Sequence, residues 1–109
     1  MLSSANRLHK EDVDGVFRAG KPLFVMNIGV RFQKNNQKTT KFSFLIGKKY
    51  AKKAIERNRF KRLAREATRS LQKNWPEGYN IVVFVIKKPV SLSKEALALS
   101  LSSIFGKIR

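Results

Sequence analysis

Cysteine is absent from this chain, and histidine, proline and acidic residues are scarce. Its 109 residues include no Cys, one His, three Pro and seven Asp or Glu. A chain without thiols forms no disulfide and holds no metal through thiolates. No apolar run is long enough to span a bilayer, and the first ten residues lack the apolar core of a secretory signal. These absences disfavour a secreted or membrane-spanning protein and make a cytoplasmic protein the expectation.

The residues that usually perform catalysis form no recognisable motif. The chain has no G-x-S-x-G, P-loop or H-E-x-x-H pattern. A nuclease that works without RNA needs clustered carboxylates or histidines to hold a metal and activate water. The single histidine, His9, has no matching ligand set and is interpreted as a surface residue. For Glu11, Asp12 and Asp14 a magnesium site stays open, but compensation of a helix dipole is favoured. We expect no catalytic residue and no metal ligand in the protein.

Positive charge, by contrast, is in large excess. Lys and Arg number 24, which gives a formal net charge of +17. The chain is also 42% apolar, which favours a folded domain over a disordered basic tail. We therefore expect one domain over residues 1–109 that binds a polyanion, and nucleic acid is the default partner.

The charge is concentrated between Lys48 and Lys73, where eleven basic residues accompany two acids. At 3.6 residues per turn, a helix over this run has one apolar and one cationic face. The apolar face holds Phe60, Leu63, Ala64, Ala67 and Leu71, and the opposite face holds Asn58, Arg62, Arg65 and Arg69. Like charges three and four residues apart repel one another. A helix that accepts this cost is typical of a surface that binds phosphate groups.

The remaining periodicity predicts two more helices and three or four strands. Helices are expected over 11–19 and after a cap at Ser91 or Ser93. The apolar stripe of the last helix is Leu97, Leu101, Ile104 and Phe105. Strands are expected over 23–32, either whole or split in two, and over 41–46 and 80–86. Residues 33–38 have the composition of a hairpin connection.

Alternation assigns the strand residues to faces. Phe24, Met26, Ile28, Val30 and Phe32 are expected toward the core, and Val25, Asn27, Gly29 and Arg31 toward an open face. Lys41 and Ser43 would continue that open face, whereas Phe42, Phe44, Phe84 and Trp75 are expected in the core. A polar sheet face suits an extended single strand of nucleic acid, but alternation alone also produces such a face. Both interpretations stay open.

The predicted fold class is α+β. It is a small α/β sandwich of three helices on an approximately four-stranded mixed sheet. The strand–helix–strand order across the basic helix predicts a parallel pairing of 41–46 with 80–86. Segment 80–86 is apolar at both parities, which indicates a strand covered on both faces.

The basic helix also carries a family resemblance. Residues 54–66 read AIERNRFKRLARE and follow a strand that ends in Gly47-Lys48-Lys49. Together with Asn6-Arg7-Leu8 near the start and the segment 80–89, this block resembles the protein subunit of bacterial ribonuclease P. The resemblance implies a ribosomal-protein-like fold with a left-handed strand–helix–strand crossover. It also implies two partners, a catalytic RNA and precursor tRNA, and cleavage by the RNA with magnesium.

The resemblance and the charge pattern together assign two candidate surfaces. The first contacts the catalytic RNA and comprises Lys48, Lys49, Lys52, Lys53, Arg57, Asn58, Arg59, Lys61, Arg62, Arg65 and Arg69. The second is a cleft for the single-stranded 5′ leader and comprises Val13, Phe17, Val25, Asn27, Arg31, Lys41 and Ser43. Val13 departs from the family, which usually has an aromatic residue there. The segment between Gly20 and Phe24 is also shorter than in many members.

The leading hypothesis is the protein cofactor of a ribonucleoprotein endonuclease that removes the 5′ leader of precursor tRNA. No cofactor is expected on the protein, because Mg²⁺ would be held mainly by the RNA, and neither membrane binding nor oligomerisation is expected. Composition does not separate this hypothesis from a ribosomal protein that clamps rRNA. A membrane-surface helix is disfavoured because the alanine-rich apolar face buries little area.

Overall fold

The computed structural model describes residues 4–86 and 93–108. Its centre is a four-stranded sheet in the order β1-β2-β4-β3. The strands are β1 (Lys21–Val25), β2 (Ile28–Lys34), β3 (Lys41–Leu45) and β4 (Tyr79–Val85), and the helices are α1 (Lys10–Ala19), α2 (Ala54–Ser70) and α3 (Lys94–Ile108). Two 3₁₀ turns, η1 (Ser4–Asn6) and η2 (Gln72–Asn74), complete the order. The predicted α+β class is confirmed.

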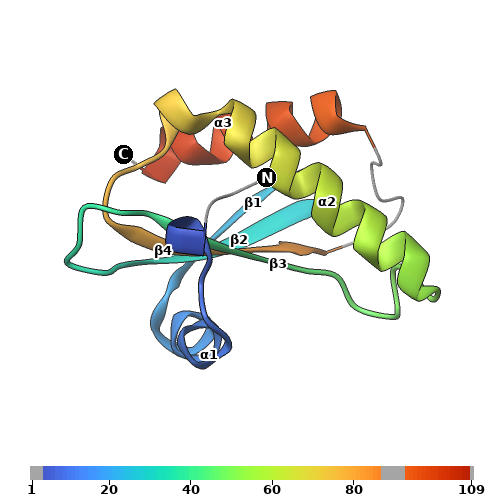
Figure 1. Ribbon diagram of the computed structural model, residues 1–109, viewed down its shortest axis with the longest axis horizontal. Helices are drawn as coiled ribbons and strands as arrows, with labels where there is room; N and C mark the ends of the chain where they lie inside the picture. Colours follow the sequence, from blue (N-terminus) through green and yellow to red (C-terminus); the bar gives the residue numbers. More distant parts are fainter. Residues whose placement is uncertain (1–3, 87–92, 109) are drawn as a thin grey trace.

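The helices lie on opposite faces of the sheet. α2 and α3 cover one face and α1 lies alone on the other (Figure 1). The larger core is on the face of α2 and α3, where Phe60 and Phe105 are fully buried against Ile81 and Val83 of β4. A smaller core on the α1 face contains Leu8, Val16 and Val82. β4 is therefore covered on both faces, as its apolar pattern predicts.

α2 and α3 pack along the predicted apolar stripes, but α2 begins at Ala54 and not directly after Lys48-Lys49, because residues 47–53 form a loop. Ala64 and Ala67 of α2 have no exposed surface, and these small side chains allow α3 to pack closely against the helix. At the start of α3, the Ser93 hydroxyl accepts a 3.2 Å hydrogen bond from the Ala96 N–H, which identifies Ser93 as the cap. The alternative cap, Ser91, lies outside the described residues.

The segment 23–32 forms two strands joined at Met26-Asn27, the second of the two expected arrangements. Met26 adopts a left-handed φ of 56°, which reverses the chain, and Val25 pairs with Ile28 across the turn. Residues opposite one another in an antiparallel pair share a face. Val25 therefore lies on the same face as Ile28, whereas one continuous strand would have placed it on the other.

The prediction of a hairpin between β2 and β3 is wrong. β4 lies between them, antiparallel to β2 and parallel to β3. The connection crosses the start of β4, where the Asn35 N–H donates to the Gly78 carbonyl at 2.9 Å. Gly78 has a φ of +78°, and a Cβ there would lie 2.4 Å from the Gln37 carbonyl oxygen. β4 takes the inner position between β2 and β3, which suits a strand that is apolar at both parities.

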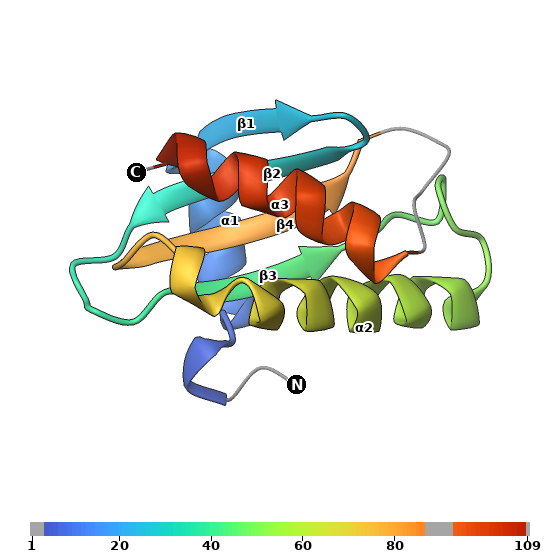
Figure 2. The same cartoon turned by 90° about the horizontal axis from the view of Figure 1, so that it is seen from above.

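The parallel pairing of β3 and β4 across α2 is confirmed. Seen from the side of the helices, β3 and β4 run in the same direction, α2 returns in front of the sheet, and the crossover is left-handed (Figure 2). This handedness is opposite to that of most such crossovers. It places α2 beyond β3 at the edge of the sheet, where its outer face is free.

Candidate nucleic-acid interface

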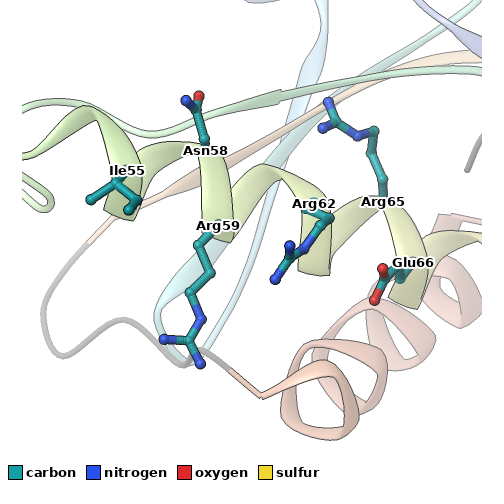
Figure 3. A pocket seen from close by; sticks show the side chains of 6 residues that line it. All are labelled: Ile55, Asn58, Arg59, Arg62, Arg65 and Glu66. Atoms are coloured by element: carbon teal, nitrogen blue, oxygen red, sulfur yellow. The ribbon is translucent and has the colours of Figure 1, made fainter.

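α2 carries its cations outward because its other face is anchored in the core. Phe60, Ala64 and Ala67 fix the helix on the sheet with no exposed surface. Six side chains, namely Ile55, Asn58, Arg59, Arg62, Arg65 and Glu66, line a shallow depression of about 760 Å³ along the outer face. Asn58 and Arg65 point to one side of the helix and Arg59 to the other (Figure 3). A ligand on this face would meet guanidinium groups from both sides.

The eleven residues predicted to contact RNA differ in exposure. Eight are exposed: Lys48, Lys49, Lys52, Lys53, Asn58, Arg59, Arg62 and Arg69. Arg57, Lys61 and Arg65 are half-buried. Ile55 was not predicted to belong to this surface, yet 76% of its area is exposed beside the arginines. Its position outside the apolar stripe of α2 is the sequence signal that places it there.

Lys61 and Arg65 also face a second depression, at the free edge of β3. This groove has a volume of about 370 Å³ and is lined in addition by Arg7, Leu8 and three residues of β3. Arg7 forms an isolated parallel bridge with Phe42, and the Leu8 N–H donates to the Phe42 carbonyl at 2.8 Å. The N-terminal segment thereby adds Arg7 to the cations of α2, a contribution that the helical pattern alone does not indicate.

Three aromatic side chains gather on the α1 face of the sheet. The ring of Phe84 lies between Phe17 of α1 and Phe24 of β1, with centroid distances of 5.4 and 6.4 Å. Gly29 lies beneath them, and a Cβ at this position would be 2.8 Å from the Phe84 ring and 2.9 Å from the Phe24 ring. Phe24 remains 54% exposed. These rings form an apolar surface with an accessible edge, which we call the aromatic cluster (Phe17, Phe24 and Phe84).

Five of the seven predicted cleft residues lie on this face. Val13 and Phe17 come from α1, Arg31 from β2, and Lys41 and Ser43 from β3, on the side opposite the core residues Phe42 and Phe44.

The predicted placement of Val25 and Asn27 in the cleft is wrong. Val25 packs against the core of α2 and α3, and Asn27 lies in the turn beside Ala96 and Leu97 of α3. The chain reversal at Met26 moves both residues away from the α1 face.

Phe24 and Phe84, which were not predicted to belong to the cleft, lie on the α1 face where Val25 and Asn27 were expected. Phe24 was expected on the core side, but the reversal transfers it to the α1 face. Phe84 was expected in the core, and it is a half-buried member of the smaller cluster. The signal that identifies both residues is the pairing register of the strands, which the alternation of one strand does not contain.

Arg31 lies between the sheet and the last turn of α1. Its Nη1 donates to the carbonyl oxygens of Phe17 at 3.3 Å and Gly20 at 3.4 Å, while its Nε is buried and has no protein partner. A cation at a helix C-terminus is electrostatically favourable. The side chain predicted to meet the leader is therefore engaged with the backbone of α1.

Glu11 and Asp12 lie in the first turn of α1, the position at which carboxylates complement the helix dipole. Across residues 4–86 and 93–108, no three His, Asp or Glu side chains are grouped closely enough to hold a metal ion. In the same part of the chain, no helix is both long and apolar enough to cross a membrane.

The fold and the site define a small α+β protein with an exposed cationic helix at one edge of the sheet and an aromatic cluster on the α1 face. Residues 2–109 match the model of the family described as Ribonuclease P. The chain belongs to this family.

Relatives agree with the assignment. The chain is 36% identical over 72 residues to the ribonuclease P protein component of Pelotomaculum thermopropionicum, covering 66% of this chain and 63% of that protein. It is 33% identical over 95 residues to the component of Pseudoalteromonas atlantica, covering 85% and 77%. The structure superposes on the RNase P protein from Thermotoga maritima with a TM-score of 0.83 and 28% identity, covering 94% and 97% of the two chains.

Proposed function

We propose that this chain is the RNA-binding protein subunit of ribonuclease P, the ribonucleoprotein endonuclease that removes the 5′ leader from precursor tRNA. The catalytic RNA would bind the outer face of α2 and the lysines that precede it. The leader would lie on the α1 face, against the aromatic cluster. The catalytic RNA, with magnesium that it holds itself, would cleave the phosphodiester bond. The complex would act in the cytoplasm, with no membrane and no protein oligomer.

One observation supports this division most strongly. The exposed arginines of α2 and the aromatic cluster occupy different surfaces: α2 lies on one side of the sheet, and the cluster, in which Phe24 is exposed, lies on the α1 face. Guanidinium groups bind phosphates and suit a folded RNA with a dense backbone. Aromatic rings stack on unpaired bases and suit a single strand. A protein that carries both kinds of surface can hold a substrate leader beside a catalytic RNA.

The test is cleavage of precursor tRNA by the ribonuclease P RNA of the same organism, with and without the purified protein. At low magnesium we expect the protein to increase cleavage markedly, because its cations screen the repulsion between two RNAs. The protein alone should cleave nothing. Cleavage by the RNA-free protein would contradict the proposal, as would no effect of the protein on the RNA or recovery of rRNA alone with the native protein.

A further inference from the structure

The chain between β3 and α2 holds four lysines in six residues. We call residues 47–53 the lysine loop; Lys48, Lys49, Lys52 and Lys53 are all exposed in it. Like charges at this density repel one another and favour a spread of conformations. Ordering such a loop only when it binds RNA would cost conformational entropy. The arrangement of the loop in the free protein therefore matters for its affinity.

Arg57 fixes the second half of this loop. The side chain comes from the first turn of α2, and its Nη1 donates to the carbonyl oxygens of Ala51 and Lys52, each at 2.9 Å. Both hydrogens of this nitrogen are thereby used by the loop backbone. Ala51 itself is 6% exposed and belongs to the core. The loop is thus attached to α2 immediately next to two of its lysines.

Tyr50 fixes the first half of the loop. Its hydroxyl donates to the Ile86 carbonyl at 2.7 Å, directly after the end of β4. The Ile86 N–H in turn donates to the Asn27 carbonyl at 2.9 Å, so the anchor continues into the β1–β2 turn. The Nζ of Lys49 lies 5.6 Å from the centroid of the Tyr50 ring, within the range of a cation–π contact.

We infer that Arg57 and Tyr50 are positioning residues that hold the lysine loop as a rigid continuation of the cationic face of α2. Arg57 acts through the loop backbone, and the phosphate contacts belong to the lysines and to the exposed arginines. This inference rests on the proposed function for its RNA partner. The hydrogen bonds on which it depends, however, exist in the RNA-free protein and are testable there.

The first measurement is limited trypsin digestion of the RNA-free protein, with cleavage after each loop lysine followed by mass spectrometry. Arg57→Lys keeps the charge but loses the two-pronged donor, and Tyr50→Phe removes only the hydroxyl. We expect cleavage in the loop to be about two- to tenfold faster in both variants, the effect of one lost hydrogen bond of ordinary net strength. Arg59→Lys is the matched control, since Arg59 is exposed on the same turn, and its loop should remain as resistant as in the wild type.

The second measurement is affinity for the ribonuclease P RNA, on variants whose circular dichroism spectra match the wild type. We expect binding about two- to tenfold weaker for Arg57→Lys and Tyr50→Phe. The control for binding is Arg18→Lys, an exposed arginine of α1 on the opposite face of the sheet, and its affinity should be nearly unchanged. Weaker binding with an unaltered loop would mean that Arg57 or Tyr50 contacts RNA directly, and unaltered binding with a loosened loop would mean that rigidity is irrelevant; either result overturns the inference. A wild-type protein that does not bind this RNA would instead overturn the proposed function.

Discussion

The guanidinium of Arg31 on β2 donates to the carbonyl oxygen of Phe17 on α1, with 3.3 Å between Nη1 and the oxygen. The same residue of α1 carries the ring that packs on Phe84. Val16 is the only fully buried side chain of this helix. Because α1 buries so little surface, the hydrogen bonds of Arg31 contribute substantially to the position of α1, and therefore to the position of the Phe17 ring on the sheet.

Replacing Arg31 by Met should therefore loosen α1 and disturb the aromatic cluster. The variant keeps the length and apolar stem of the side chain but removes its donors, at an expected cost of about 1 kcal/mol in the free energy of unfolding. We expect faster hydrogen exchange in α1 and a smaller preference for precursor over mature tRNA. Arg31→Lys, which retains charge at the helix C-terminus, should be milder. If Arg31→Met instead lowers affinity for both tRNAs equally and leaves exchange unchanged, the side chain meets RNA phosphate directly.

The aromatic cluster makes a separate prediction. Phe17→Ala should weaken binding of precursor tRNA with little effect on mature tRNA, because only the precursor has a leader to stack. The expected loss is about 1–3 kcal/mol in binding free energy, the usual contribution of one stacked base. Titration of the protein–RNA complex with both tRNAs measures it. An equal loss for the two tRNAs would show that Phe17 serves only to pack α1 on the sheet.

The cationic face of α2 is expected to act through charge alone. Arg62→Ala combined with Arg65→Ala removes two cations from the depression on the helix and leaves its apolar face intact. The logarithmic dependence of RNA affinity on salt should become shallower by about one to two units, and folding should persist. Affinities measured over a range of salt concentrations, with circular dichroism as the control, test this. A collapsed fold would show that these arginines are structural.

Much of this arrangement could be predicted from local sequence pattern. The apolar stripes of α2 and α3 and the two-sided strand β4 each depend on periodicity within one segment, which reports burial directly. The exposed arginines follow from the same helical wheel. The left-handedness of the β3–α2–β4 crossover was predicted from the family resemblance, because no local sequence pattern indicates it.

The pairing of the strands could not be predicted in the same way. Met26-Asn27 lacks the Asn-Gly or Gly-Gly signal of a two-residue turn. The alternation of Leu23–Phe32 is therefore equally compatible with one continuous strand. That one reversal changes the faces of Phe24 and Val25. The insertion of β4 between β2 and β3 depends on contacts between residues distant in the sequence. The contact of Phe84 with Phe17 follows from that insertion, and it could not be predicted from local pattern either.

Gly29 provides a final prediction about how the aromatic cluster is built. A methyl group at Gly29 would lie within 2.9 Å of both the Phe24 and the Phe84 rings, so Gly29→Ala must displace at least one of them. We expect a loss of about 1–3 kcal/mol in the free energy of unfolding, the usual cost of overpacking, and weaker precursor binding. Gly15→Ala is the control: it lies within α1, and apart from its chain neighbours and the helix's own backbone no atom lies within 4 Å of the added carbon, so it should stabilise the protein by about 0.5–1 kcal/mol. Thermal and urea denaturation measure both variants. If Gly29→Ala is as stable as the wild type and binds precursor tRNA equally well, the close approach of the rings to β2 does not shape this surface.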